Sequence, residues 1–147
     1  MIYYEDIETD KKTVSQDYQV DKNEMVAFAK KWDPQPFHTD EEAAAQWPMG
    51  LTDSSTYSYA LLTKLQTEIP GEKPAIVAGL GIDEWRTPTP LKAGDTVHSE
   101  SRVESKRESK SKPGMGILVS ISQLLNQNGD IILSYKSTGI VLKKPVE

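Results

Sequence analysis

The chain has 147 residues, of which 37% are hydrophobic and 27% charged, which is the size and composition of one soluble globular domain. We therefore expect a single domain over residues 1–147. Seventeen basic and twenty-two acidic residues give a net charge of −5, which argues against nucleic acid as a partner. The chain contains no cysteine, so disulfides, thiolate metal sites and a cysteine nucleophile are excluded. The first residues show no secretory signal pattern, and no apolar run approaches the roughly 20 residues of a membrane span, so we expect a cytoplasmic protein with no membrane partner.

Short strands and one amphipathic helix are predicted at the start of the chain. Residues 1–20 are polar with scattered Tyr, Ile and Val, which is typical of one or two short edge strands. Asp21 can cap a helix, and Glu24 three positions later completes a capping-box pattern. Pro34 ends this helix, because the residue before a proline avoids the helical conformation. The apolar residues in between repeat at helical spacing: Met25, Phe28, Ala29 and Trp32.

Two further helices are predicted before residue 70. One is short, rich in Glu and Ala, and covers Asp40 to Gln46. The other runs from about Ser54 to Thr67 and is closed by a Pro-Gly pair at 70–71. This longer helix is expected to be buried on more than one side. Its three-to-four spacing comes from Tyr57, Ala60, Leu61, Lys64 and Leu65, and its apolar surface is widened by Tyr59 and Leu62.

Beyond about residue 75 the pattern predicts strands. Residues 75–85 are apolar, and residues 96–105 and 117–125 alternate between apolar and polar side chains. Asn128-Gly129 is a strong hairpin signal and leads into a last strand at 131–142. A helical first half followed by antiparallel strands predicts an α+β domain, and the simplest arrangement is one apolar helix lying on a curved sheet.

The segment from Asp33 to His38 is the candidate site for chemistry. It places a carboxylate and one of only two histidines five residues apart, and its two prolines are expected to keep it out of a helix. An Asp/His pair can activate a water molecule and return a proton near neutral pH. The residue types alone favour a structural role, in which Asp33 ends one helix and His38 flanks the next. In an extended chain the two Cα atoms would lie roughly 15 Å apart, so a shared water requires the loop to bend back on itself.

Other polar residues have ordinary structural explanations. His98 lies on the polar face of an alternating strand and is expected to be a solvated surface histidine. The five basic residues between Arg102 and Lys112 are more typical of a solvated hairpin tip than of a phosphate site. No cluster of histidines and carboxylates has metal-ligand spacing.

The start of the third helix has two possible roles. Asp53 or Ser54 is an ordinary N-cap, which explains the residue types fully. Free N–H groups at a buried helix start could instead hold a developing oxyanion, helped by the positive end of the helix dipole. The sequence does not distinguish these roles.

The segment Asp33-Pro34-Gln35-Pro36-Phe37-His38 resembles the hydratase motif of MaoC-like dehydratases, which are hotdog-fold proteins that include the (R)-specific enoyl-CoA hydratases. The family motif reads Asp-x-Asn-Pro-x-His, so this chain departs from it only at Gln35. The resemblance extends to the start of the third helix at residues 50–55 and to a Pro-x-x-x-Gly-Asp turn at residues 90–95. It therefore covers nearly the whole chain.

This resemblance implies a hotdog fold, in which a curved antiparallel sheet wraps around one long helix, here about residues 54–67. It also implies a homodimer or a larger homo-oligomer with its sites at or near the dimer interface. The implied activity is that of a lyase: reversible hydration of a trans-2-enoyl-CoA to an (R)-3-hydroxyacyl-CoA. The CoA thioester is then the substrate, and no cofactor or metal ion is expected.

The same resemblance assigns roles to site residues. Asp33 and His38 would share one water, one accepting its proton as oxygen attacks C3 and the other supplying a proton to C2. The backbone N–H of Ser55 is the expected oxyanion donor. The expected substrate-binding residues are Gln35, Ser54 and Tyr57.

Two departures from the family concern the helix start. Ser55 stands where many members have glycine, so its Cβ could crowd the thioester or strain the backbone if φ must be positive. Asp53 stands where the family often has a small apolar residue. Its carboxylate would oppose the developing charge if it points inward and would be harmless if it caps the helix. Two alternative functions are a non-catalytic acyl-CoA-binding subunit, which these departures would suggest, and an acyl-CoA thioesterase, which does not need the Asp/His loop.

Overall fold

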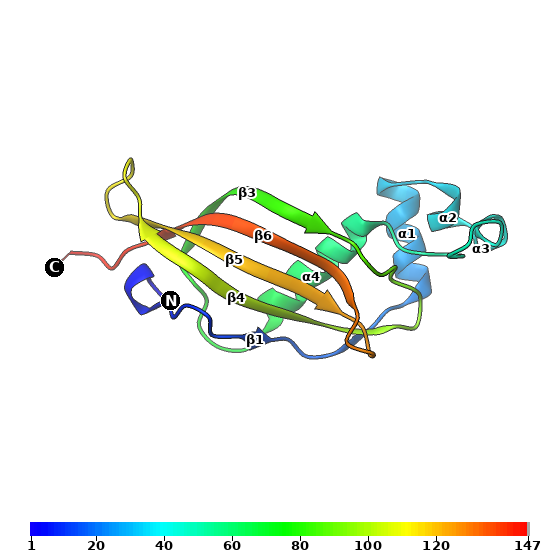
Figure 1. Cartoon of the computed structure of the whole chain (residues 1–147), viewed down its shortest axis with the longest axis horizontal. Helices are drawn as coiled ribbons and strands as arrows, with labels where there is room; N and C mark the ends of the chain where they lie inside the picture. The colour runs from blue at the N-terminus through cyan, green and yellow to red at the C-terminus, as the bar shows by residue number, and fades with distance from the viewer. Residues whose placement is uncertain (147) are drawn as a thin grey trace.

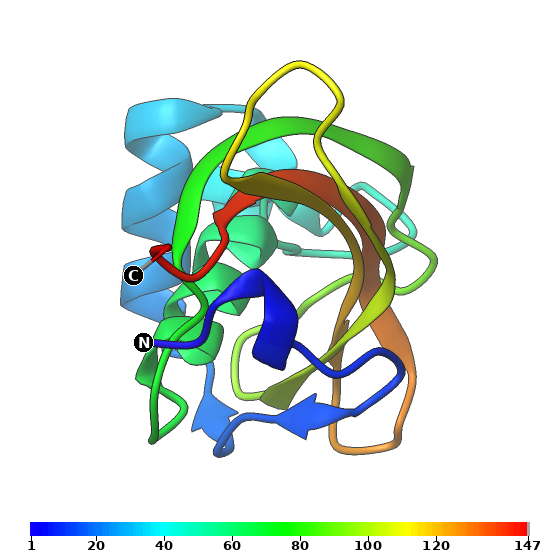
Figure 2. The same ribbon diagram turned by 90° about the vertical axis from the view of Figure 1, so that its left-hand side faces the viewer.

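An antiparallel sheet curved around one long helix forms the main body of the chain. The computed structural model describes residues 1–146 (Figure 1). The helices are a 3-10 turn (Tyr4–Asp6), α1 (Lys22–Trp32), α2 (Pro36–Thr39), α3 (Glu41–Ala44) and α4 (Ser55–Glu68). The strands are β1 (Thr13–Val14), β2 (Tyr18–Gln19), β3 (Ile76–Arg86), β4 (Thr96–Glu108), β5 (Met115–Leu125) and β6 (Ile131–Leu142). Viewed along the sheet, the strands curve around α4, and α1 lies outside that curve (Figure 2).

The sheet is built from hairpins between neighbouring long strands. Its order is β1-β4-β5-β6-β3, all antiparallel, and β2 pairs with the first residues of β4. The predicted turn between β5 and β6 is confirmed: Asn126 Oδ1 accepts the N–H groups of Asn128 and Asp130, both at 3.0 Å. Gly129 in this turn has φ = +78°, a conformation that glycine adopts without steric cost. The predicted α+β hotdog architecture is confirmed.

The core lies between α4 and the concave face of the sheet. Leu62 and Leu65 of α4 have no exposed surface, and neither do Leu124 of β5 and Leu133 of β6, which belong to the same cluster. Burial of each such side chain contributes about 1.5–3 kcal/mol. Two positions that were predicted on the buried face, Ala60 and Lys64, are exposed, because the buried side of α4 is centred on the leucines.

Helix α1 begins and ends as predicted. Asp21 caps it by accepting the Glu24 N–H at 2.9 Å, and Met25 and Ala29 are fully buried. The prediction for Trp32 was wrong, since this side chain is 65% exposed in the last turn of the helix.

The segment after α1 also departs from prediction. The two prolines were expected to exclude helix, but Pro36 begins α2 and His38 lies inside this short helix. A proline is tolerated at the first helical position because that residue's N–H has no acceptor within the helix. Only Pro34 acts as a helix stop.

Strand β3 forms one edge of the sheet and is exposed along nearly its whole length. Its large apolar side chains are between 42% and 56% exposed, and they are Ile76, Val77, Leu80 and Ile82. This contrasts with β5 and β6, whose apolar residues are all buried or half-buried. Within residues 1–146, no helix is long and apolar enough to cross a membrane.

Candidate active site

A tight turn between α1 and α2 brings Asp33 and His38 together. Asp33 ends α1 by donating its N–H to Ala29 O, and the Gln35 N–H then donates back to Asp33 O at 2.8 Å. The helical turn of α2 follows, with the His38 N–H bonded to Gln35 O at 3.0 Å. His38 Nε2 consequently lies 3.7 Å from Asp33 Oδ2. The loop bends back as the shared-water hypothesis requires.

The imidazole of His38 is held in one orientation. The residue is 8% exposed, and its Nδ1 lies 2.8 Å from the backbone oxygen of Thr52. A carbonyl oxygen can only accept, so Nδ1 carries the proton and donates it. In the neutral ring, Nε2 is therefore the acceptor nitrogen, and it is the one that faces Asp33.

The carboxylate of Asp33 is held at both oxygens. Gln35 Nε2 donates to Oδ1 at 2.8 Å, and Ser54 Oγ donates to Oδ2 at 2.8 Å. These two hydrogen bonds hold the pKa of Asp33 below its usual value, and the bond from Gln35 has the larger effect. Asp33 is thus ionised at neutral pH. Gln35, the one departure from the family motif, is the residue that fixes the Asp33 carboxylate from within the turn.

These residues line a pocket of about 350 Å³ beside the start of α4. Its opposite wall is the loop after β3, which contains two Thr-Pro pairs at residues 87–90. The complete lining is Asp33, Gln35, His38, Met49, Thr52, Asp53, Ser55, Ser58, Thr87, Pro88, Thr89, Pro90 and Ile132. A carboxylate, an acceptor imidazole nitrogen and a helix N-terminus therefore meet in one cavity.

Ser55 is the first residue of α4 and faces this pocket. The first N–H groups of a helix have no acceptor within the helix and point beyond its N-terminus, so the Ser55 N–H is placed as an oxyanion donor would be. Its φ is not positive. The Cβ therefore causes no backbone strain here, and of the two concerns about Ser55 only its bulk beside the substrate stays open.

Ser54 and Gln35, two of the three expected substrate-binding residues, contact Asp33 directly. Tyr57 lies elsewhere. Its side chain is 4% exposed in the main core, and its hydroxyl donates to Glu24 Oε1 at 2.6 Å. Tyrosine at this position of α4 points toward α1, so the structure does not bring it together with the pocket residues.

The Asp53 carboxylate both caps the helix and faces the pocket, the two placements that the sequence left open. Its Oδ2 accepts the Ser58 hydroxyl at 2.5 Å and the Ser58 N–H at 3.2 Å, so it caps the first turn of α4. It also lines the pocket and is 8% exposed. Burial raises the pKa of Asp53 to about 7, against the opposing effect of the Ser58 hydrogen bonds. Ser54 occupies the N-cap position of α4 but uses its hydroxyl for Asp33 instead.

The remaining candidates lie away from this pocket. His98 is half-buried rather than solvated, with Nε2 at 3.5 Å from Glu100 Oε1. The basic hairpin between β4 and β5 is at the opposite end of the sheet from α2 (Figure 1). Two of its cations already have partners: Arg102 binds Asp10 at 2.9 Å, and Lys106 donates to the backbone oxygens of Tyr4 and Ile7. In residues 1–146, no group of three or more His, Cys, Asp or Glu side chains is arranged to hold a metal ion.

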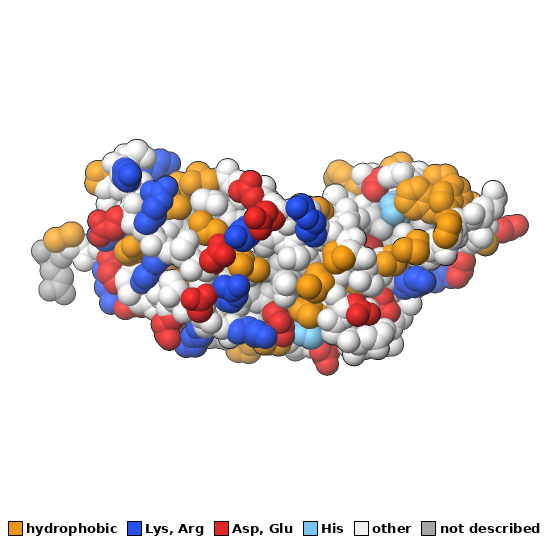
Figure 3. Space-filling model, viewed as in Figure 1, with side chains coloured by type: hydrophobic (Ala, Val, Ile, Leu, Met, Phe, Trp, Pro, Cys, Tyr) orange, Lys and Arg blue, Asp and Glu red, His pale blue; other side chains and the backbone are white. Residues whose placement is uncertain are grey.

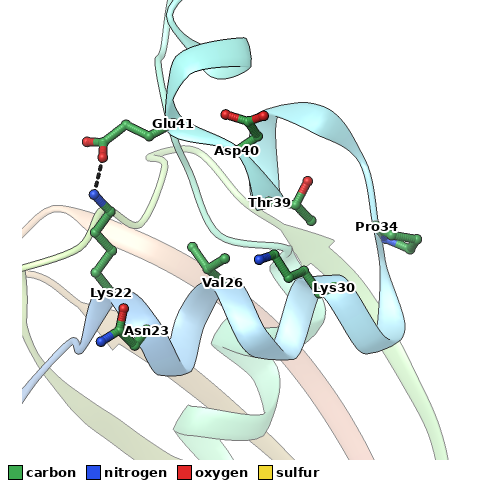
Figure 4. A pocket seen from close by; sticks show the side chains of 8 residues that line it. All are labelled: Lys22, Asn23, Val26, Lys30, Pro34, Thr39, Asp40 and Glu41. Carbon is green, nitrogen blue, oxygen red and sulfur yellow. Dashed lines mark hydrogen bonds and ion pairs between the residues drawn. The ribbon is translucent and has the colours of Figure 1, made fainter.

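A second hollow of about 570 Å³ lies on the other side of the loop, between α1 and the segment from Pro34 to Glu41 (Figure 4). An ion pair between Lys22 and Glu41 spans it and ties α1 to α3. This hollow is the larger of the two, but the Asp33/His38 pair does not open into it. We place the candidate chemistry in the smaller pocket for that reason.

Exposed hydrophobic side chains gather around the end of the molecule formed by α1–α3, whereas charges of both signs intermix over the sheet (Figure 3). The large exposed ones in this region are Trp32, Trp47 and Met49. Phe37 links Trp47 to the site, since its ring centroid lies 5.6 Å from that of Trp47 and 4.2 Å from that of His38. The rim of the pocket is apolar on this side.

Three parts of the candidate site were not predicted from the sequence. The backbone oxygen of Thr52 fixes His38, Ser58 holds Asp53, and the 87–90 loop closes the pocket. A backbone acceptor has no signature in residue type, and Ser58 looks like any polar residue within a helix. The Thr-Pro pairs were visible in the sequence but indicate only a turn.

Comparison with known proteins identifies the family of this chain. A family model described as a MaoC-like domain matches residues 6–122. A MaoC-like dehydratase from Rhodospirillum rubrum is similar in structure, with a TM-score of 0.89 and 32% identity over 99% of this chain and 100% of that one. A search of curated proteins found no significant match.

Two more distant structures share the fold. An R-hydratase from Pseudomonas aeruginosa has a TM-score of 0.73 and 22% identity, covering 99% of this chain and 90% of that one. A Mycobacterium tuberculosis protein described as having a double hotdog fold has a TM-score of 0.76 and 13% identity over 99% of this chain and 45% of that one. The family model and the Rhodospirillum protein carry the assignment: the chain belongs to the MaoC-like dehydratase family.

Proposed function

We propose that this chain catalyses the reversible hydration of a trans-2-enoyl-CoA, or a related acyl thioester, to the (R)-3-hydroxyacyl form. The observation that carries the proposal is the pair formed by Asp33 Oδ2 and His38 Nε2, 3.7 Å apart in a pocket at the N-terminus of α4. Membership of the MaoC-like dehydratase family supports hydratase or dehydratase activity in general terms.

The spacing of the pair suits one shared water. A distance of 3.7 Å is too long for a direct hydrogen bond, but a water between the two atoms can donate one hydrogen to each. Asp33 is ionised and Nε2 is an acceptor, so both partners are in the state that such a water requires. The water oxygen then keeps a lone pair for attack on C3.

The roles of the two residues follow from their protonation. As the oxygen bonds to C3, His38 Nε2 takes one proton from the water, and the nearby Asp33 carboxylate stabilises the imidazolium. The second hydrogen stays on the oxygen, bonded to Asp33, and becomes the product hydroxyl. His38 then returns its proton to C2 on the same face, so hydrogen and hydroxyl add syn from one water molecule.

Negative charge develops on the thioester oxygen between these two steps. The N–H of Ser55, at the positive end of the α4 dipole, is the donor proposed for it. One such donor typically lowers the barrier by about 3–4 kcal/mol. The proposed step uses only the side chains and backbone of this chain and the CoA thioester itself, and it assigns no role to a cofactor or metal.

The acid–base assignment predicts large losses on substitution. Asp33→Asn and His38→Ala should each lower kcat for hydration by about 10²–10⁴-fold, the contribution of a positioned acid–base group. Decay of the enoyl-thioester absorbance measures this directly. His98→Ala is the matched control, since it removes the other histidine and should retain nearly full activity. A loss below about tenfold in either site variant would contradict the assignment.

The same assay separates the other candidate functions. Release of free CoA thiol from a saturated acyl-CoA, unaffected by His38→Ala, would indicate a thioesterase. Stabilisation of the protein by acyl-CoA without any turnover would indicate a binding subunit. A hydratase gives neither result and equilibrates enoyl and 3-hydroxyacyl thioesters from both directions.

We also propose that two copies of the chain pair along β3 to form a homodimer. An eleven-residue apolar edge strand exposed to solvent would promote uncontrolled association, and pairing with a second copy removes that exposed edge. The loop that closes the pocket follows β3 directly, at residues 87–90. The proposed interface therefore lies close to the proposed site.

A further inference from the structure

Asp53 occupies a central position in the pocket without a part in the proposed proton transfer. It stands between Thr52, whose backbone oxygen holds His38, and Ser54, whose hydroxyl holds Asp33. Its carboxylate turns under the first turn of α4 to meet Ser58, which is 1% exposed and also lines the pocket. Asp53 and Ser58 together form a buried polar pair facing the space that the acyl group must enter.

This arrangement is costly if its only purpose is to cap α4. A serine or asparagine would accept the Ser58 N–H without burying an ionisable group. The lining of the pocket contains no lysine or arginine to neutralise Asp53, and burial has a larger effect on its pKa than the Ser58 hydrogen bonds have. A buried, perturbed carboxyl beside an acid–base pair is typical of a functional group.

The pocket as a whole favours small, polar acyl groups. Nine of its thirteen lining residues are polar, and the apolar ones are Met49, Pro88, Pro90 and Ile132. Its volume of about 350 Å³ is near the lower end of the range for small-molecule sites. Leu61, Leu62 and Leu65 of α4 pack in the main core and are at most 3% exposed, so within residues 1–146 these leucines leave almost no apolar surface open to a longer acyl chain.

We propose that Asp53, held by Ser58, makes the pocket selective for short acyl groups with a hydroxyl on C4, the carbon next to the double bond. Unsubstituted acyl groups of the same length would be disfavoured. This inference rests on the proposed function and narrows its substrate class. An alkyl group against Asp53 would remove water from the carboxyl and return no hydrogen bond. A hydroxyl fits either protonation state, because it can donate to a carboxylate or accept from a carboxylic acid.

The test compares hydration of trans-2-butenoyl-CoA with that of its 4-hydroxy derivative. Wild-type kcat/KM should favour the hydroxylated substrate by at least about tenfold, and Asp53→Ala should bring the ratio close to one by improving turnover of the unsubstituted thioester. Thr67→Ala, at an exposed position on the same helix, is the matched control and should keep the wild-type ratio. Equal wild-type rates, or a ratio unchanged by Asp53→Ala, would overturn the inference.

Binding of the saturated analogues, butanoyl-CoA and 4-hydroxybutanoyl-CoA, makes this result independent of turnover. Calorimetric dissociation constants should show the same preference for the hydroxylated ligand and its loss in Asp53→Ala. If neither butenoyl substrate is hydrated but this preference is present, the hydratase proposal fails and the selectivity of Asp53 stands. If hydration proceeds and the two analogues bind equally, the hydratase proposal stands and the selectivity of Asp53 is refuted.

Discussion

At the scale of single residues, the site depends on hydrogen bonds that fix two titratable side chains. His38 is oriented by a backbone carbonyl, so its tautomer is set by the path of the chain and not by another side chain. Asp33 is oriented by Gln35 from its own loop and by Ser54 from the start of α4. The candidate Asp33/His38 pair is therefore tied through Ser54 to the start of α4, a helix with five buried residues.

The hydrogen bonds to Asp33 predict a measurable change in its pKa. Gln35→Ala and Ser54→Ala should each raise this pKa toward the usual aspartate value, because each removes a donor that stabilises the charged form. Titration of the Asp33 carboxyl carbon by NMR measures the change, and the Asp33→Asn variant assigns the signal. Gln46→Ala removes an exposed glutamine just beyond α3 and should have no effect. An unchanged or lowered pKa in both Asp33-contact variants would refute this account of the loop.

At the scale of elements, two short features position the candidate site. Helix α2 is only four residues long, but it turns the chain enough to bring His38 back beside Asp33. The ion pair between Lys22 and Glu41 fastens the following helix to α1 (Figure 4). The segment between α1 and α4 is thus tied to α1 at Glu41.

The exposed edge of β3 predicts the effect of charged substitutions on assembly. Leu80→Lys combined with Ile82→Lys should yield a monomer by sedimentation equilibrium, because lysine on an edge strand disfavours pairing with a second strand. Val14→Lys is the matched control. It places lysine at a half-exposed apolar position on β1, the opposite edge of the sheet, and should leave the dimer intact. A monomeric wild-type protein, or a dimer that survives the double substitution, would contradict pairing through β3.

At the scale of the whole molecule, the buried carboxyl of Asp53 couples stability to pH. The folded chain retains its proton up to about pH 7, whereas an unfolded aspartate releases it near pH 4. Unfolding therefore releases a proton between these pH values, and the free energy of unfolding should fall as pH rises from about 4 to about 7. The upper bound on this loss is about 4 kcal/mol.

Asp53→Asn tests this coupling, because asparagine keeps an acceptor for Ser58 and cannot ionise. Urea unfolding at pH 5 and pH 8 should show a smaller loss of stability with rising pH in this variant than in the wild type. Asp21→Asn removes an exposed capping carboxylate and should keep the wild-type dependence. Parallel pH dependences of the wild type and Asp53→Asn would mean that Asp53 is already ionised when folded.

Much of this molecule follows from local rules that the sequence carries by itself. The cap at Asp21, the stop at Pro34 and the turn at Asn128-Gly129 depend on the conformations of a few adjacent residues, and all three are confirmed. The helix-then-strands order is set by hydrophobic period, and the Asp33-to-His38 segment is recognisable as a motif.

Only the tertiary structure decided which residues share the pocket. Tyr57 and Ser58 are neighbours on α4, but a helix turns about 100° per residue, so one faces the core beside α1 and the other faces Asp53. Thr52, the 87–90 loop and the exposed edge of β3 take their roles from segments distant in sequence. The sequence by itself determined the helix cap, the helix stop and the hairpin turn, because these depend on neighbouring residues, and it pointed to Asp33 and His38 through their resemblance to a family motif. Burial, tautomer and pocket lining depend on long-range packing, which no local pattern contains.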